Sequence, residues 1–64
     1  MASRPEITRY VHARRPELNE EHAGHLASAL ILRYGAGQFW RDAVTGDTQG
    51  SISDEQFETV AAER

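Results

Sequence analysis

Two histidines, His22 and His25, have the type and spacing that metal chemistry uses. Three residues apart on a helix, two imidazoles share one side and can chelate a divalent cation, with Glu17 or Glu21 as a possible third ligand. The zinc-protease motif differs, because it places two histidines four residues apart around a general-base glutamate. The sequence contains no cysteine, no third ligand has a recognisable spacing, and His12 adds nothing to the pair. We therefore expect surface or interface histidines, no metal and no cofactor.

The hydroxyl side chains offer little for nucleophilic catalysis. An activated serine or threonine needs a neighbouring base that a third group orients. Ser3, Ser53 and Thr45 instead occupy predicted helix caps and turns, where their structural role already explains them. Gly35 and Gly37 lack the third glycine of a nucleotide-binding loop and follow a helix rather than a strand. A chain this short also leaves little room for a pocket of about 300 Å³. The sequence predicts that the protein is not an enzyme.

Arginines near the start of the chain favour a different site, one for nucleic acid. Arg4, Arg9 and Arg15 lie on or beside one predicted helix, and guanidinium groups match the geometry of phosphates. Arg41, near the tip of a predicted hairpin, would then belong to a wing. Against this, the net charge is −3, whereas nucleic-acid binders are strongly basic or carry a dominant basic stripe. The second predicted helix is also too apolar to be a recognition helix. A small DNA-binding regulator that uses the arginine-rich first helix is therefore our alternative function.

Small and aromatic residues indicate protein interaction instead. Gly24 and Ser28 are four residues apart on the long predicted helix, which lets another helix approach closely, either from the same chain or from a second one. Ala29 and Leu32 fall outside the main apolar stripe of that helix. Trp40 is either a plug for a small core or an interface anchor. We take these five residues as the candidate interface of a non-catalytic, self-associating protein-interaction module.

Three predicted helices position these residues, and a capping residue marks the start of each. Ser3 and Ser53 each stand three residues before a glutamate or glutamine, the spacing of a capping box, and Asn19 caps the longest helix. Pro16 ends the first helix and Gly35 ends the second. Apolar stripes on all three helices predict the core, which on the long helix includes Leu26, Leu30 and Tyr34.

Residues 38–52 allow two interpretations. The apolar period of residues 39–44 is compatible with a short helix that ends at Gly46. Alternatively, Asp42 begins a hairpin turn that its carboxylate caps, Gly46 supplies the positive φ, and residues 48–52 form the second strand. We favour the hairpin. The predicted fold class is α+β and mainly helical, in the order helix, long central helix, β-hairpin, helix; the alternative is a small all-α bundle.

Length and composition constrain the molecule as a whole. Residues 1–64 make a single small domain, and a domain of roughly 60 residues buries only about 60% of its unfolded surface. Small domains usually add a disulfide, a metal or a partner subunit. Because this chain contains no cysteine, we expect a homodimer or a higher oligomer.

Charge and hydropathy say something about partners and source. Residues 1–16 carry four arginines against one glutamate, and residues 17–64 carry three arginines against nine acidic residues, so the two parts could dock within one chain or between two. All seven basic residues are arginine, which is typical of a GC-rich bacterial or phage genome. No apolar run is long enough to span a bilayer, and the first residues do not resemble a signal peptide. We expect a cytoplasmic protein without a membrane partner.

Overall fold

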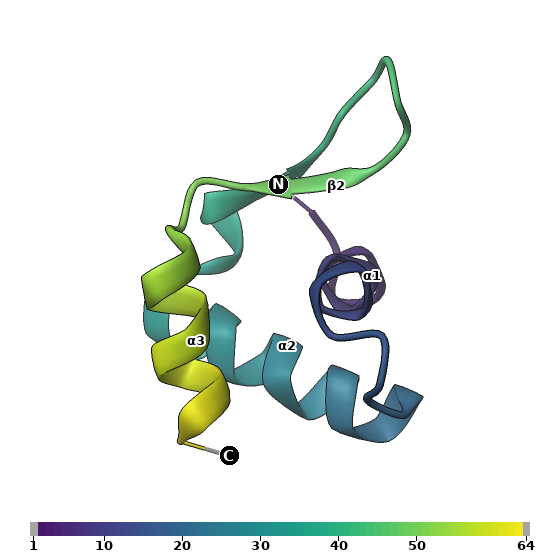
Figure 1. Ribbon diagram of the computed structural model, residues 1–64. Helices are drawn as coiled ribbons and strands as arrows, with labels where there is room; N and C mark the ends of the chain where they lie inside the picture. The colour runs from purple at the N-terminus through teal and green to yellow at the C-terminus, as the bar shows by residue number, and fades with distance from the viewer. Residues whose placement is uncertain (1, 64) are drawn as a thin grey trace.

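The computed structural model describes residues 2–63, which form three helices and one β-hairpin (Figure 1). The elements are α1 (Arg4–Arg14), α2 (Glu20–Tyr34), a single 3-10 turn η1 (Ala36–Gln38), β1 (Phe39–Arg41), β2 (Thr48–Gly50) and α3 (Asp54–Ala62). The predicted α+β class and the predicted order of elements are confirmed. Within the described residues, no helix is both long and apolar enough to cross a membrane.

Side-chain caps fix the start of each helix. The N–H of Ser3 donates to Oε1 of Glu6 at 2.8 Å, and the hydroxyl of Ser3 accepts from the N–H of Glu6. Ser53 forms the same reciprocal pair with Gln56, and Asn19 accepts from a backbone N–H of α2 at 2.7 Å. Each bond satisfies a donor that the first helical turn leaves free. The three predicted starts are therefore confirmed by their hydrogen bonds.

The turn of the hairpin has the chemistry that the sequence predicts. The carboxylate of Asp42 accepts from the N–H of Val44 at 2.7 Å and from the N–H of Thr45 at 3.1 Å. Gly46 has a φ of 77°, in the left-handed region where only glycine avoids strain. The hairpin is therefore confirmed, and the short helix is wrong for this segment.

The two strands pair antiparallel and place Phe39 opposite Gly50. The second strand is shorter than predicted, because the chain leaves the sheet after Gly50 and turns Ile52 into the core. Gly50 lies directly against two aromatic rings. A Cβ there would stand 2.9 Å from Cδ1 of Phe39 and 3.3 Å from Cε2 of Tyr10. Glycine is needed at this position for the close approach of the hairpin to the core.

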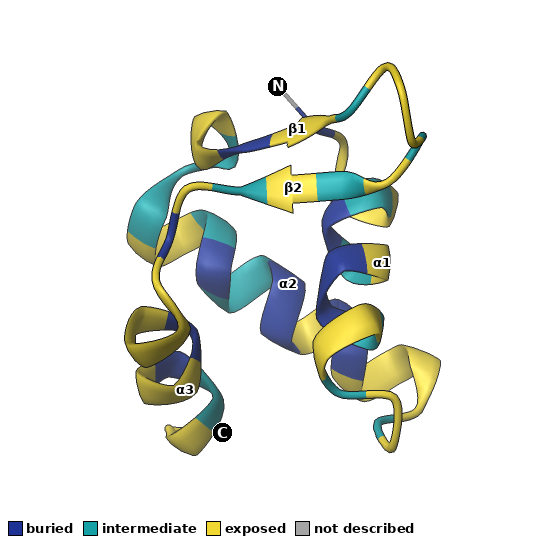
Figure 2. Ribbon diagram, turned by 45° about the horizontal axis from the view of Figure 1, so that its top comes forward, coloured by how far each residue is buried: buried dark blue, intermediate teal, exposed yellow. Residues whose placement is uncertain are grey.

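One core lies between the helices and beneath the hairpin, as the burial colours of Figure 2 show. Tyr10 of α1 joins the parts, because its ring makes edge contacts with Phe39 of the hairpin at 5.3 Å and with Phe57 of α3 at 6.0 Å between centroids. Such edge-to-face geometry is favourable for aromatic pairs. The largest fully buried side chains are Phe39, Phe57, Ile7, Leu30, Val11 and Val60.

Two positions differ from the predicted core. Leu26 and Leu30 are buried as expected, but Tyr34 is only half-buried. It lies in the last turn of α2, where its ring packs against the core and its hydroxyl donates to the carbonyl of Gln56 at 3.3 Å. Ala2, which the helical pattern does not include, is buried, and its N–H donates to the carbonyl of Phe39 at 2.9 Å.

Candidate functional site

The small residues of α2 are covered by α1. Nη2 of Arg4 donates to the carbonyl of Gly24 at 3.2 Å, and Nε of Arg4 donates to the hydroxyl of Ser28 at 2.9 Å. Gly24 is buried and Ser28 is half-buried. The close approach that this spacing permits is therefore used within the chain. Of the two alternatives that the sequence left open, these contacts correspond to an approach from within the same chain.

The other candidate interface residues differ in exposure. Ala29 is half-buried against the core, whereas Leu32 is 88% exposed and Trp40 is 43% exposed. Trp40 is not a core plug, because its neighbour Phe39 fills that place on the opposite face of β1. α2 and the hairpin lie on opposite sides of α1 and α3 (Figure 1), and α2 packs chiefly against the other helices. Leu32 and Trp40 are thus the exposed members of the candidate interface.

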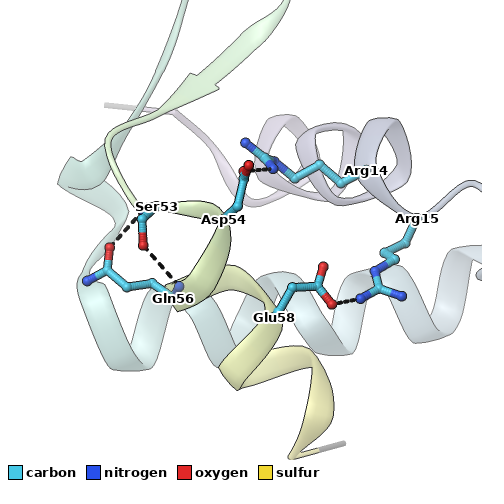
Figure 3. A network of polar contacts seen from close by, with 6 residues as sticks. All are labelled: Arg14, Arg15, Ser53, Asp54, Gln56 and Glu58. Atoms are coloured by element: carbon cyan, nitrogen blue, oxygen red, sulfur yellow. Dashed lines mark hydrogen bonds and ion pairs between the residues drawn. The ribbon is translucent and has the colours of Figure 1, made fainter.

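Several arginines are neutralised inside the molecule. Arg14 forms an ion pair with Asp54 and Arg15 forms one with Glu58, so that the end of α1 is tied to α3 (Figure 3). The guanidinium of Arg14 also covers the rings of Tyr10 and Phe57. The basic start and the acidic remainder of the sequence therefore meet within one chain. Their charge asymmetry no longer argues for pairing between subunits.

Arg9 differs from the other two arginines of the nucleic-acid prediction. Arg4 is engaged with α2 and Arg15 with α3, whereas Arg9 has no carboxylate within ion-pair distance among the described residues. Hydrogen bonds from the backbone N–H and the hydroxyl of its cap serine lower the pKa of Glu6, and the charges of Arg41 and Arg9 lower it further. Of these three arginines, Arg9 is thus the one with neither an ion pair nor a side-chain hydrogen bond among the described residues.

The histidines line an open groove of about 490 Å³ between the α1–α2 loop, α2 and α3. His22, His25 and Glu17 all border this groove, together with the apolar side chains of Leu18 and Leu26. Within residues 2–63, however, no three histidine or carboxylate side chains lie close enough together to hold a metal ion. His12 is apart from the pair, and its Nε2–H donates to a loop carbonyl at 3.1 Å.

A second groove, of about 420 Å³, separates α1 from the hairpin. Its α1 side is formed by Arg9, Tyr10, Ala13 and Arg14, and its other side by residues 46–49. The hydroxyl of Tyr10 is buried and has no hydrogen-bond partner among the described residues. The expectation that a domain of this size leaves little room for a pocket is wrong, because the space lies in surface grooves between short elements.

The comparisons with known proteins give no relationship to build on. No protein-family model, no curated protein and no solved structure matches the chain. The function must therefore be inferred from the geometry of this molecule.

Proposed function

We propose that this domain is a non-catalytic protein-interaction module that associates with itself. The observation that carries the proposal is the exposure of Leu32, 88% of whose surface faces solvent. Leu32 lies half a turn from Leu30, which is fully buried, so it points away from the core of its own chain. Burying a leucine side chain is favourable by about 1.5–3 kcal/mol. A second chain that covers this face of α2 would gain that energy.

Size and composition support the proposal. The chain folds around a single small core and contains no cysteine, and oligomerisation is one of the few remaining ways to stabilise such a domain. No described cluster of side chains supplies a nucleophile with an oriented base, so we infer binding rather than catalysis. The arginine-only basic composition is consistent with a bacterial or phage accessory factor that acts in the cytoplasm.

Leu32→Glu tests the proposal directly. A carboxylate in an apolar interface has no partner and is costly to desolvate, so the variant should sediment as a monomer at tens of micromolar, where the wild type sediments as a dimer or larger species. The melting temperature of the wild type should rise with protein concentration, and that of the variant should not.

Val44→Glu is the matched control. Val44 lies at the hairpin tip and is 94% exposed, so the same new charge should leave the oligomeric state unchanged. A wild-type protein that sediments as a monomer over the same concentrations would refute self-association. Equal dissociation of the Val44→Glu variant would show that net charge, rather than the Leu32 face, controls assembly.

A further inference from the structure

The two edges of the hairpin differ in whether they are occupied. The N–H of Asp42 donates to the carbonyl of Asp47 at 2.8 Å, and the N–H of Ser51 donates to the carbonyl of Gln38 at 2.9 Å, so both pairs are hydrogen-bonded pairs of the antiparallel ladder. Because hydrogen-bonded pairs alternate in an antiparallel ladder, the backbone groups of Thr48 therefore point away from β1. The outer edge of β1 is used by the N-terminal segment, as described for Ala2.

The outer edge of β2 is open. The N–H and C=O groups of Thr48 and Gly50 point to this edge, and none of them has a backbone partner within residues 2–63. Unpaired edges of this kind are templates for another strand. The hairpin can therefore be extended on one side only.

Helix α1 provides a platform for such an added strand. Ala2, just before α1, is bonded to Phe39 of β1, and Gly50 of β2 lies on Tyr10, further along the helix. A helical turn advances by about 5.4 Å and neighbouring strands are spaced by about 4.8 Å. The next turn, with Ala13, thus underlies the position of a third strand. Figure 2 shows that α1 continues past β2 on the side away from β1, and there it forms the floor of the α1–hairpin groove.

We propose that an extended, acidic segment of a partner protein adds to β2 as a third strand and occupies this groove. Main-chain bonds to Thr48 and Gly50 would supply affinity, and the side chains that face α1 would supply specificity. Those side chains meet Arg9, which has no ion-pair partner among the described residues.

The charges around the groove favour this occupant over a second copy of the chain. Asp47 and Gln49 also border the groove, and the alternation of the ladder puts their side chains on the same face as Trp40, opposite to the face that carries Phe39. The β2 strand of a second copy would present Thr48 and Gly50 to the groove and would bring no carboxylate to Arg9. The inference rests on the proposed role as a protein-interaction module, but not on self-association through Leu32.

An eight-residue peptide of alternating glutamate and threonine, blocked at both ends, is a suitable probe. It is titrated into the full ¹⁵N-labelled chain while backbone amide signals are followed by NMR. Saturable shifts are expected at Thr48, Gly50 and Arg9. A peptide with lysine in place of glutamate should bind at least about tenfold more weakly, because it brings like charge to Arg9.

Variants then separate strand addition from attraction between charges. Thr48→Pro removes an outward N–H but no bond to β1, so it should abolish binding and leave the hairpin intact. Thr48→Val keeps the N–H and should bind normally, and Arg9→Gln should weaken the acidic peptide alone. If Thr48→Pro does not fold, the glutamate peptide with N-methylated central residues tests the same bonds on the wild-type chain.

Three outcomes would overturn the inference. The first is the absence of saturable shifts at the β2 edge, and the second is equal binding of the lysine peptide. The third is a wild-type protein whose Thr48 and Gly50 amides are already protected from hydrogen exchange in a way that depends on protein concentration. That result would show that a second copy of the chain occupies the outer edge of β2. The Leu32→Glu variant should still bind the peptide, so a failure of self-association and a failure of strand addition remain distinguishable.

Discussion

Among the glycines of this molecule, Gly50 has the closest neighbours. A methyl group there would stand 2.9 Å and 3.0 Å from two ring atoms of Phe39, closer than non-bonded carbon atoms approach. Phe39 is fully buried and cannot move without displacing the core. Gly50→Ala should therefore reduce the free energy of unfolding by about 1–3 kcal/mol, measured by urea denaturation.

Gly37→Ala is the control for that substitution. Nothing lies within 4 Å of a Cβ at Gly37, and its φ is not positive. Its effect should stay within about 0.5 kcal/mol. If both variants lost the same stability, backbone freedom rather than contact with Phe39 would explain the effect at Gly50.

Acid should weaken the fold through specific carboxylates. Hydrogen bonds from the N–H groups of Thr45 and Val44 lower the pKa of Asp42, and Ser3 does the same for Glu6. A lowered pKa in the folded state gives stability that is present above the unfolded pKa and is lost as the pH falls through the folded value. The melting temperature should therefore stay level down to about pH 5 and fall below about pH 4.

The double variant Asp42→Asn, Glu6→Gln identifies the groups responsible. Its melting temperature should fall less between pH 5 and pH 2 than that of the wild type, as followed by circular dichroism. An identical decrease in both proteins would assign the acid sensitivity to other carboxylates.

At the scale of elements, α2 is the helix on which the others pack. Leu30 lies on the inner face of α2 and is fully buried. Leu32 lies on its outer face and is exposed to solvent. The same substitution at two positions of one helix therefore separates burial from helix propensity. Leu30→Ala should cost about 2–5 kcal/mol, enough to unfold a small domain.

Leu32→Ala should change stability by no more than about 0.5 kcal/mol when measured at a concentration where the protein is monomeric. Both variants are compared by thermal melting. An unchanged melting temperature for Leu30→Ala would contradict the packing described for α2.

For the whole molecule, contacts between arginines and other residues of the chain determine how well it can bind nucleic acid. Arg4 is engaged with α2, and Arg14 and Arg15 with α3. Phosphate binding depends on several free cations and weakens steeply with salt. The protein should therefore pass through a heparin column without retention at about 150 mM salt.

Retention that is sensitive to salt would instead favour the DNA-binding regulator. In that case the Arg9→Ala variant should elute earlier than the wild type, because Arg9 is the member of the predicted set with neither an ion pair nor a side-chain hydrogen bond among the described residues. Retention that does not change in Arg9→Ala would place nucleic-acid contact elsewhere on the chain.

The sequence by itself determined the three helices and their order, and it favoured the hairpin between the second and the third. Caps act over three or four residues, so Ser3, Asn19 and Ser53 could be recognised as helix starts without any knowledge of the fold. The turn at Asp42 and Gly46 is local in the same sense. These features depend on bonds between near neighbours, and the structure has each of them as predicted.

The tertiary structure alone decided which surfaces are free. The pattern of α2 put both Gly24 and Leu32 in the candidate interface, yet Arg4 covers Gly24, whereas Leu32 is exposed. The close contact at Gly50 and the burial of Ala2 likewise join segments far apart in the sequence. Long-range packing determines how a side chain such as Arg4 is used, and no spacing within one helix contains that information.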